Sequence, residues 1–222
     1  MPQHLDHVTA GFLFDMDGTL VDSTAIVEAA WGRFGAEHGI DPREILAFSH
    51  GRQTIDTVTR FLPDRSHDER VALSAALVAD EVRRTDGITE VPGAGALVRT
   101  LLDLGAPVAL VTSAPRDLAL NRMAAAGVPV PEVVVTAEDV PNGKPAPDCY
   151  RLGAEMLGLP PGDCTAFEDA EAGLVSAVAS GAHVVVVGAH TSPTTEGLDR
   201  VTDHTGVTVS RAGAGAGFRI RG

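Results

Sequence analysis

Short apolar runs alternate along this chain with longer segments that have helical periodicity. Strands buried on both faces of a parallel sheet show as continuous apolar runs bounded by Gly, Pro or Asp. Such runs occupy Gly11–Met16, Pro107–Thr112, Glu132–Thr136, Cys164–Phe167 and His183–Val187. The helical patterns between them occupy Gly95–Leu104, Arg116–Ala126, Pro147–Leu157 and Glu171–Ser180. This alternation predicts an α/β fold in which helices cover both faces of a parallel sheet.

One long segment interrupts the alternation. Between residues 23 and 86 the pattern is helical, and no strand-like run lies inside it. The helices predicted there are Thr24–His38, Pro42–Phe48, Arg52–Phe61 and His67–Arg84. An all-helical insert between the first and second strands would cover the carboxyl end of the sheet. We therefore assign residues 1–20 and 88–222 to a core domain and residues 21–87 to a helical cap domain.

The C-terminal tail has a different composition from the rest of the chain. Residues 211–217 are almost entirely Gly and Ala, which predicts a mobile segment. Phe218 and Ile220 follow this segment and are apolar enough to dock on the core.

Composition and charge narrow the class of protein. The 222 residues carry a formal net charge of −13, which disfavours nucleic acid or an anionic membrane as the partner. A small anionic substrate stays possible, because local positive groups can dominate a pocket. Cys149 and Cys164 are expected to be buried thiols. With neither a signal peptide nor an apolar stretch near the ~20 residues of a membrane span, we expect a soluble, cytoplasmic protein, a monomer or weak dimer.

Polar side chains recur where the predicted strands end. Asp15 and Asp17 lie at the end of the first strand, Thr112-Ser113 lie at the end of the second, and Glu168-Asp169 come directly after the fourth. The single lysine of the chain, Lys144, lies in a Gly/Pro-rich turn after the third. The carboxyl ends of parallel strands share one edge of the sheet, so these groups should converge on one pocket.

That set of groups indicates phosphoryl transfer. Several carboxylates at one point repel each other unless a hard cation lies among them, and Mg²⁺ prefers oxygen ligands. One carboxylate can then attack phosphorus and carry the phosphoryl group. Lys144 would hold the phosphate as a point charge, and the hydroxyl and amides from Thr112 onward would bind its oxygens. Asp17, two residues after Asp15, would donate and accept the proton.

Each feature also has a structural explanation. Asp15 and Asp17 can act as turn and helix-capping residues, and Glu168-Asp169 can cap the next helix. A lysine in a Gly/Pro turn is usually solvated, and Thr112-Ser113 can cap a helix. The occurrence of all four features in order, each at a strand end, favours the catalytic interpretation.

The same residues resemble the haloacid dehalogenase (HAD) superfamily over nearly the whole chain. Asp15-Met16-Asp17-Gly18-Thr19 is similar to its first motif, DxDGT, while Thr112, Lys144 and Glu168-Asp169 match the other three. The resemblance implies a Rossmann-like, doubly wound core. The helical insert resembles the C1 cap of the β-phosphoglucomutase-like branch. Within that branch, the chain is most similar to sugar and polyol phosphatases such as those acting on 2-deoxyglucose 6-phosphate and glycerol phosphate.

The resemblance also implies a role for each motif residue. Asp15 would be the nucleophile and Asp17 the general acid/base, with Thr112 and Lys144 on the phosphate. Gly18, Ser113 and Ala114 are implied as further substrate-binding residues. Mg²⁺ would be held by Asp15, by the backbone carbonyl of Asp17 and by Asp169, with Glu168 as a ligand either directly or through water.

Residues of the cap would select the substrate. Ser49-His50-Gly51-Arg52-Gln53-Thr54 resembles the sugar and polyol phosphatases, but this match is shorter than the others. His50 and Arg52 would either contact the hydroxyls of the substrate or lie at a helix start and on the surface. Trp31 and Phe34 have helical spacing, which predicts that they pack in the cap core.

These observations predict a Mg²⁺-dependent phosphatase for a small phosphorylated sugar or polyol. The alternative enzyme is a β-phosphoglucomutase-type phosphomutase, whose cap usually carries further phosphate-binding Arg and Lys residues. Here the cap has no lysine, so its arginines would have to substitute. A non-catalytic binding protein on the same fold is the third possibility. It is disfavoured because Asp15 and Lys144 are both present.

Overall fold

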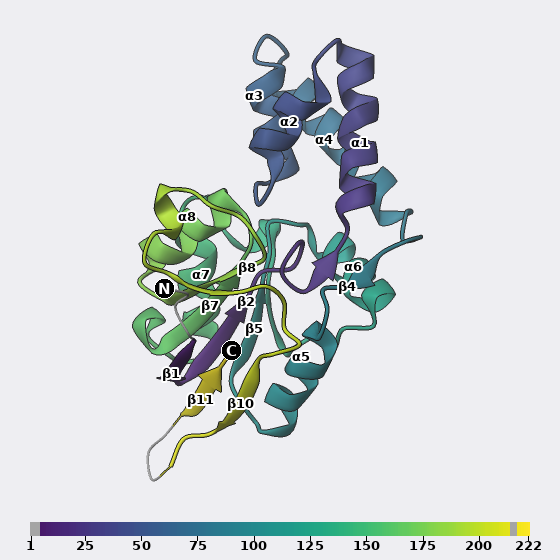
Figure 1. Ribbon diagram of the computed structural model, residues 1–222. Helices are drawn as coiled ribbons and strands as arrows, with labels where there is room; N and C mark the ends of the chain where they lie inside the picture. Colours follow the sequence, from purple (N-terminus) through teal and green to yellow (C-terminus); the bar gives the residue numbers. More distant parts are fainter. Residues whose placement is uncertain (1–4, 214–216) are drawn as a thin grey trace.

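The computed structural model describes residues 5–213 and 217–222. Within these residues, six strands form one parallel sheet in the order β6-β5-β2-β7-β8-β9. Figure 1 shows the strands running toward a group of helices at one end of the molecule. The strands are β2 (Gly11–Phe14), β5 (Val108–Val111), β6 (Val133–Val135), β7 (Cys164–Glu168), β8 (His183–Val187) and β9 (Asp199–Val201).

The strand at the centre of the sheet carries the first motif. Strand β2 pairs with β5 on one side and with β7 on the other. Successive side chains of a strand point to opposite faces, so Phe12 and Phe14 enter one core layer and Leu13 the other. All three side chains are buried, which explains why the run is apolar without alternation. The predicted strands are confirmed to within two residues, whereas β9 was not predicted.

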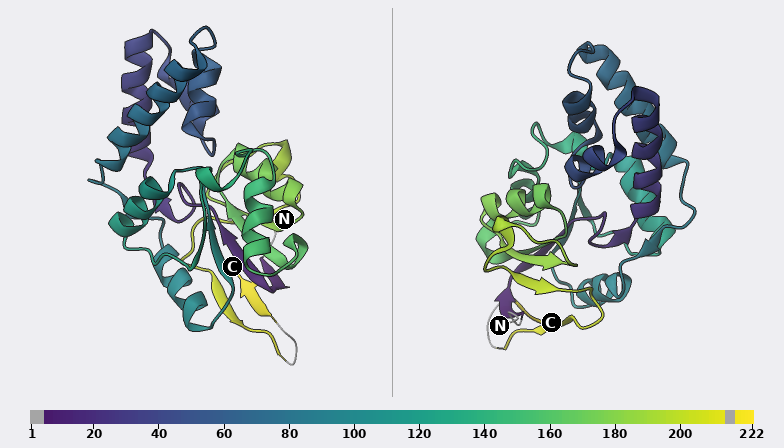
Figure 2. Two further views of the ribbon diagram at one scale, coloured as in Figure 1. Left: turned by 180° about the vertical axis from the view of Figure 1, so that it is seen from behind. Right: turned by 45° about the horizontal axis from the view of Figure 1, so that its top comes forward.

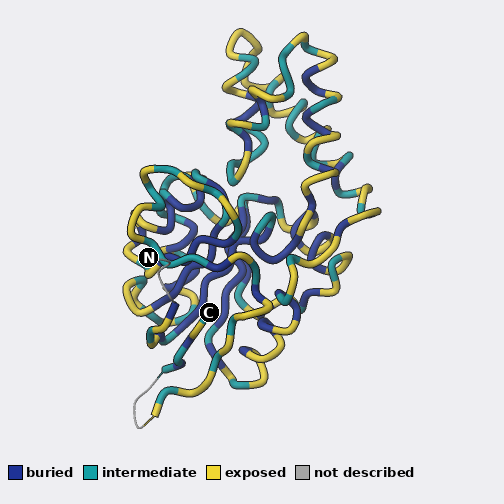
Figure 3. The backbone as a smooth tube through the Cα atoms, viewed as in Figure 1, coloured by how far each residue is buried: buried dark blue, intermediate teal, exposed yellow. Residues whose placement is uncertain are grey.

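Helices cover both faces of the sheet, as the sequence predicted. On one face lie α7 (Asp148–Met156) and α8 (Glu171–Ser180), which pack on Leu13 and its neighbours. On the other face lie α5 (Ala94–Asp103) and α6 (Arg116–Ala126). Figure 3 shows that the strands between these layers form the most continuously buried part of the chain.

The insert after β2 is helical throughout, as predicted. A small antiparallel sheet of β3 (Val21–Asp22) and β4 (Thr89–Glu90) joins the segments that enter and leave it. Its helices stand together beyond the carboxyl end of the parallel sheet in every view (Figures 1 and 2). They are α1 (Thr24–His38), α2 (Pro42–Ser49), α3 (Thr54–Phe61) and α4 (His67–Val82). We propose that residues 21–87 form a cap domain separate from the core.

The helical insert has its own apolar core. Trp31 and Phe34 pack edge to face, with ring centroids 5.4 Å apart, together with Ile45 and Val58. This agrees with the prediction that Trp31 and Phe34 belong to the cap core. Helix α4 begins with a capping box, in which Ser66 and Glu69 bind each other's backbone N–H groups. The insert is therefore a folded unit that can keep its shape beside the sheet.

A second, antiparallel sheet lies at the end of the molecule away from the helical insert (Figure 1). It pairs β1 (Asp6–Thr9) with β11 (Phe218–Arg221), and β11 with β10 (Thr208–Arg211). Phe218 and Ile220 are buried against the main core, so their predicted docking is confirmed. The mobility predicted for 211–217 is wrong at its start, because Arg211 belongs to β10. Residues 214–216 lie outside the described part of the chain.

Candidate active site

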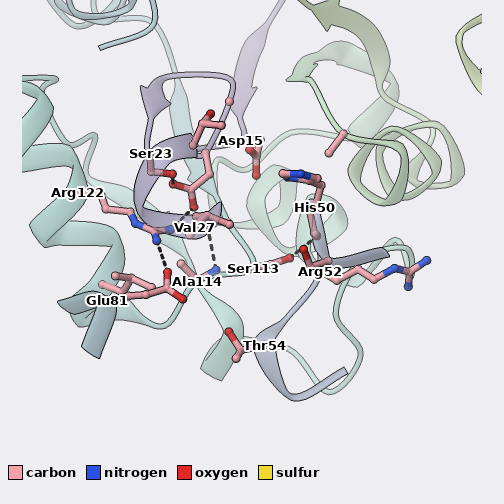
Figure 4. A pocket seen from close by; sticks show the side chains of 18 of the residues that line it. Asp15, Ser23, Val27, His50, Arg52, Thr54, Glu81, Ser113, Ala114 and Arg122 are labelled. Carbon is pink, nitrogen blue, oxygen red and sulfur yellow. Dashed lines mark hydrogen bonds and ion pairs between the residues drawn. The ribbon is translucent and has the colours of Figure 1, made fainter. Parts of the chain in front are cut away.

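The four sequence motifs meet at the carboxyl edge of the parallel sheet. Asp15 follows β2, Thr112 follows β5, and Glu168 is the last residue of β7. Asp15, Thr112 and Asp169 line a cavity of about 150 Å³ that is also lined by side chains of the helical insert (Figure 4). The edge of the sheet and the insert therefore enclose one site between them.

Lys144 is the positive centre of this site. The residue is 1% exposed, and its ammonium group donates to Oδ1 of Asp15 at 2.5 Å and to Oε1 of Glu168 at 2.6 Å. A third bond, of 3.2 Å, goes to the backbone carbonyl of Val111. The solvated alternative for this lysine is therefore wrong. Buried ammonium groups need such partners, and these fix the position of the charge beside Asp15.

Glu168 is bound to donors through both carboxylate oxygens. Besides Lys144, the hydroxyl of Tyr150 donates to Oε1 at 3.0 Å. The backbone N–H groups of Asp169 and Ala170 donate to Oε2 at 2.9 and 3.2 Å. In this arrangement Glu168 holds Lys144 and the loop after β7. Tyr150 was not identified from the sequence, where it is one residue of an ordinary amphipathic helix.

Two glycines allow the acidic side chains to approach the backbone. A Cβ at Gly173 would lie 1.6 Å from Oε1 of Glu168, and a Cβ at Gly18 would lie 2.0 Å from Oδ2 of Asp169. Gly18 also has a φ of +84°, which L side chains rarely adopt. These positions must stay free of a side chain if the two carboxylates are to keep their places.

Asp17 is held in a different way from Asp15. The hydroxyl of Ser23 donates to Oδ1 at 2.6 Å, and Nη1 of Arg122 lies 2.7 Å from Oδ2. Nη2 of the same arginine is ion-paired with Glu81 of α4 (Figure 4). The Asp17 side chain is 30% exposed and that of Arg122 only 4%. Asp17 thus faces the cavity from a fixed position.

Arg122, Glu81 and Ser23 were not identified from the sequence. The signal for Arg122 was available, because it lies on the face of α6 that buries Leu118, Ala119 and Met123. A charged residue on the apolar face of a helix requires a buried partner. That partner comes from the helical insert, which the spacing of residues along α6 does not reveal.

Burial and crowding shift the pKa values of the acidic groups. Burial, together with the charge of Glu168, raises the pKa of Asp15 to about 8 despite the opposing effect of Lys144. Burial and the charges of Glu168 and Asp15 raise the pKa of Asp169 well above its usual range. Burial opposes the charge of Lys144, but Asp15 and Glu168 outweigh it and raise the pKa of the ammonium group. The site therefore contains more negative charge than Lys144 alone can balance.

The segment after β5 brings Thr112, Ser113 and Ala114 to the cavity. The amide of Ala114 donates to Oγ1 of Thr112 at 3.0 Å. The Ser113 hydroxyl donates to the carbonyl of Gly51 in the insert at 2.8 Å. Ser113 therefore links the sheet edge to the loop between α2 and α3. This contact ties the helical insert directly to a residue predicted to bind substrate.

The cap residues expected to contact the substrate, His50 and Arg52, differ in their direction relative to Asp15. His50 and Arg52 both line the cavity. The Arg52 guanidinium, however, lies over the ring of Phe48, 4.4 Å from its centroid, and extends away from Asp15 in Figure 4. Helix α2 ends at Ser49 and α3 begins at Thr54, so His50 and Arg52 belong to the intervening loop rather than to a helix start. Trp31 lines the same cavity from α1 as well as packing in the insert.

A group of carboxylates in this site is suited to a cation. Asp15, Glu168 and Asp169 each offer an oxygen, and these oxygens lie within 4.8 Å of one another. Lys144 contacts Asp15 and Glu168 and supplies one positive charge, which is less than the negative charge of three carboxylates. Oxygen ligands with excess negative charge fit a hard divalent ion such as Mg²⁺.

Comparisons with known proteins identify the relatives of this chain. The family model for haloacid dehalogenase-like hydrolases matches residues 9–181. Hexitol phosphatase A of Escherichia coli is 49% identical over 179 residues, which are 81% of this chain and 83% of the relative. Glycerol-1-phosphate phosphohydrolase 2 of Saccharomyces cerevisiae is 34% identical over 182 residues, covering 78% of this chain and 72% of the relative.

A solved structure matches over most of the chain. The β-phosphoglucomutase of Clostridium difficile superimposes with a TM-score of 0.77, covering 88% of this chain and 91% of its own. At 21% sequence identity, this likeness bears on the fold alone. It agrees with the expected Rossmann-like core and helical insert.

Proposed function

The chain belongs to the haloacid dehalogenase-like hydrolases, and we propose that it hydrolyses phosphate monoesters of small sugars or polyols with Asp15 as the nucleophile. The observation that carries the proposal is the contact of 2.5 Å between Lys144 and Asp15 at the sheet edge. It places a buried cation beside the carboxylate that follows the central strand. The phosphatase relatives support the reaction class and the kind of substrate.

The first half of the reaction uses Asp15 and Asp17. The Asp15 carboxylate attacks phosphorus, forming a bond to it as the bond from phosphorus to the ester oxygen breaks. Asp17 gives its proton to the departing alcohol. Lys144 balances charge on the phosphate oxygens, while the backbone amides and hydroxyls of Thr112, Ser113 and Ala114 bind them. The fixed contacts of Asp17 with Ser23 and Arg122 support this role, because they hold its carboxylate at the cavity wall.

In the second half, water removes the phosphoryl group from Asp15. Asp17, now a carboxylate, takes a proton from the attacking water as the acyl phosphate bond breaks. Phosphate leaves, and Asp15 and protonated Asp17 are restored. The helices α1–α4 would act as a cap that admits the ester and then excludes water from the cavity. The contact of Ser113 with Gly51 supports this cap role, since it joins the two parts over the site.

The acidic group of this site fits Mg²⁺. Asp15 and Asp169, together with the backbone carbonyl of Asp17, would hold the ion, and Glu168 is the further candidate. When bound, Mg²⁺ would offset the repulsion between the carboxylates and a phosphate dianion. Glu168 accepts four hydrogen bonds, from Lys144, from Tyr150 and from two amides of the loop after β7, so its main role is to position these groups. We propose that its contact with Mg²⁺, direct or through water, is secondary to that role.

The test is release of inorganic phosphate from a panel of esters, measured with Mg²⁺ and with EDTA. The panel contains hexitol phosphates, glycerol phosphates, 2-deoxyglucose 6-phosphate, glucose and fructose phosphates, phosphoglycolate and β-glucose 1-phosphate. We expect metal-dependent release that Asp15→Asn abolishes. Asp64→Asn, which changes an exposed aspartate in the turn before α4, is the matched control and should keep wild-type rates.

Two outcomes would contradict the proposal. If Asp15→Asn releases phosphate at the wild-type rate, Asp15 is not the nucleophile. If β-glucose 1-phosphate is converted to glucose 6-phosphate without net phosphate release, the protein is a phosphomutase. The oligomeric state, monomer or weak dimer, and the cytoplasmic location remain predictions. Among residues 5–213 and 217–222, each helix is too short or too polar to cross a bilayer.

A further inference from the structure

A second cluster of metal-binding side chains lies at the opposite end of the sheet from Asp15. His183 is the first residue of β8, Asp199 is the first of β9, and His7 lies in β1. The strands of the parallel sheet begin at this edge, whereas the candidate active site lies where they end. The cluster is therefore independent of the proposed phosphatase reaction.

The side chains of this cluster are close to one another. His7, His183 and Asp199 each offer a ligand atom, and these atoms lie within 4.8 Å of one another. The rings of His7 and His183 have centroids 3.9 Å apart, and Nε2 of His183 lies 2.9 Å from Oδ2 of Asp199. Two imidazoles thus stand beside a carboxylate on three different strands, so long-range packing brings them together.

The ring of His7 is held by a hydrogen bond in a way that suits a metal ligand. Its Nε2 lies 2.7 Å from the hydroxyl of Thr165, a fully buried residue of β7. Its Nδ1 is buried and has no hydrogen-bond partner among the residues that the structure describes. A histidine that binds a metal through one nitrogen usually has the other fixed by a hydrogen bond. In His7 the hydrogen bond to Thr165 fixes Nε2, and the buried Nδ1 is available to bind a metal ion.

We propose that His7, His183 and Asp199 form a second metal site, for a divalent transition metal of the zinc class. Two nitrogens and one carboxylate oxygen are a ligand set typical of Zn²⁺, unlike the all-oxygen group around Asp15. The side chains of His183 and Asp199 are 42% and 20% exposed, which gives the ion access from solvent and leaves room for a water ligand. The site would fasten β1 to β8 and β9.

In the test, the full-length protein is first freed of metal and then titrated with Zn²⁺ in the presence of excess Mg²⁺, and binding is measured by calorimetry. A parallel titration with Co²⁺ reports nitrogen ligation through its visible absorption. We expect one Zn²⁺ to bind per chain, and His183→Asn to weaken its binding by about 100-fold or more. Thr165→Val, which removes the hydrogen bond to His7, should weaken binding by roughly 10-fold.

Matched variants separate this site from others. His67→Asn changes an exposed histidine at the start of α4, and Asp169→Asn changes the active-site cluster. Both should bind Zn²⁺ as the wild type does. Phosphate release by His183→Asn with Mg²⁺ should equal that of the wild type, which shows that the variant is folded. Asp199→Asn serves as a second ligand variant should His183→Asn prove unstable.

The proposal is overturned by either of two results. One is the absence of Zn²⁺ binding to the wild type at concentrations that saturate ordinary zinc proteins. The other is binding of equal affinity to the wild type, His183→Asn and Asp199→Asn, which would place the ion elsewhere, for example on the thiols of Cys149 or Cys164. Neither result would affect the proposed phosphatase, whose test depends on Asp15.

Discussion

Nη1 of Arg122 lies 2.7 Å from Oδ2 of Asp17, and this ion pair connects the predicted acid/base to the helical insert. The same guanidinium group contacts Glu81 of α4 through Nη2. Arg122 and Glu81 are 3% and 6% exposed, so their charges are largely removed from water. Burial, opposed by Arg122, raises the pKa of Glu81. The position of α4 is therefore coupled to the position of Asp17 through one side chain.

Arg122→Met should damage both stability and activity. Removal of the guanidinium leaves Glu81 buried without its partner, which costs about 3–5 kcal/mol of unfolding free energy. Asp17 also loses one of its two fixed contacts, so kcat for phosphate release should fall by about 10- to 100-fold. Urea unfolding and steady-state kinetics measure the two effects. The control is Arg116→Met, on the same helix but half-exposed, which should change unfolding free energy by less than about 1 kcal/mol.

The double variant Arg122→Met/Glu81→Gln tests the origin of that loss. Removing both charges eliminates the unpaired buried carboxylate, so we expect stability to recover relative to Arg122→Met alone. Activity should not recover, because Asp17 still lacks its arginine. If the double variant is as unstable as the sum of the single variants, the two side chains do not interact in the folded protein.

Gly173→Ala should disrupt the site although it replaces no charged residue. The added Cβ would lie 1.6 Å from Oε1 of Glu168, so that carboxylate must move and release Lys144. We expect phosphate release to fall by about 100-fold, comparable to the loss of one electrostatic contact in an active site. The matched control is Gly32→Ala in α1, where a Cβ meets no atom within 4 Å. It should retain full activity and gain about 0.5–1 kcal/mol of stability.

Lys144→Met should abolish most activity because no other group replaces its charge. The ammonium group binds Asp15 and Glu168 together, and its loss leaves their carboxylates adjacent and unbalanced. We expect the rate of phosphate release to fall by at least about 1,000-fold. Circular dichroism should confirm that the variant is folded. A rate within tenfold of wild type would remove Lys144 from the proposed mechanism.

Asp169→Asn should act mainly on the metal requirement. One carboxylate of the acidic group becomes neutral, so the concentration of Mg²⁺ needed for half-maximal phosphate release should rise by about 10-fold or more. Removal of metal by EDTA should silence the wild type, and added Mg²⁺ should restore it. Asp163→Asn, at an exposed position just before β7, is the control and should keep the wild-type Mg²⁺ dependence.

His204 should make stability depend on pH below neutrality. Its ring is 2% exposed and lies 2.8 Å from the Thr19 carbonyl through Nε2. Burial lowers its pKa from the ordinary value of 6.5, although the Thr19 contact and the nearby acidic groups oppose the shift. The unfolded chain then binds a proton that the folded one does not, so stability is intact above pH 6.5 and falls as the pH drops below it.

The measurement is urea unfolding between pH 8 and 5 for wild type and His204→Gln. The contribution of one such histidine reaches at most about 1.4 kcal/mol per pH unit. We expect the wild type to lose more stability than His204→Gln across this range, because glutamine keeps a donor for Thr19 but does not titrate. Parallel curves for the two proteins would show that His204 is protonated equally in the folded and unfolded states.

The sequence was sufficient to predict the central sheet and the helical insert because both depend on local patterns. The run ending at Phe14 is apolar in every position since both faces of β2 are covered, and the helices of the insert carry their own spacing and capping signals. The small sheet of β1, β10 and β11 was missed because its strands are short and partly exposed. Their pairing joins the two ends of the chain, which no short window contains.

Residue identity alone selected Asp15, Asp17, Lys144 and Asp169, because charged groups at strand ends have few structural reasons to recur in order. Tertiary structure decided how those charges are balanced. It placed Glu168 on Lys144 rather than in solvent, and it paired Arg122, which contacts Asp17, with Glu81, a residue 41 positions away in sequence. The physical reason is that desolvation requires a partner for each buried charge but does not specify where along the chain that partner lies. The sequence therefore identified the candidate reactive groups, and the fold determined the contacts that hold them.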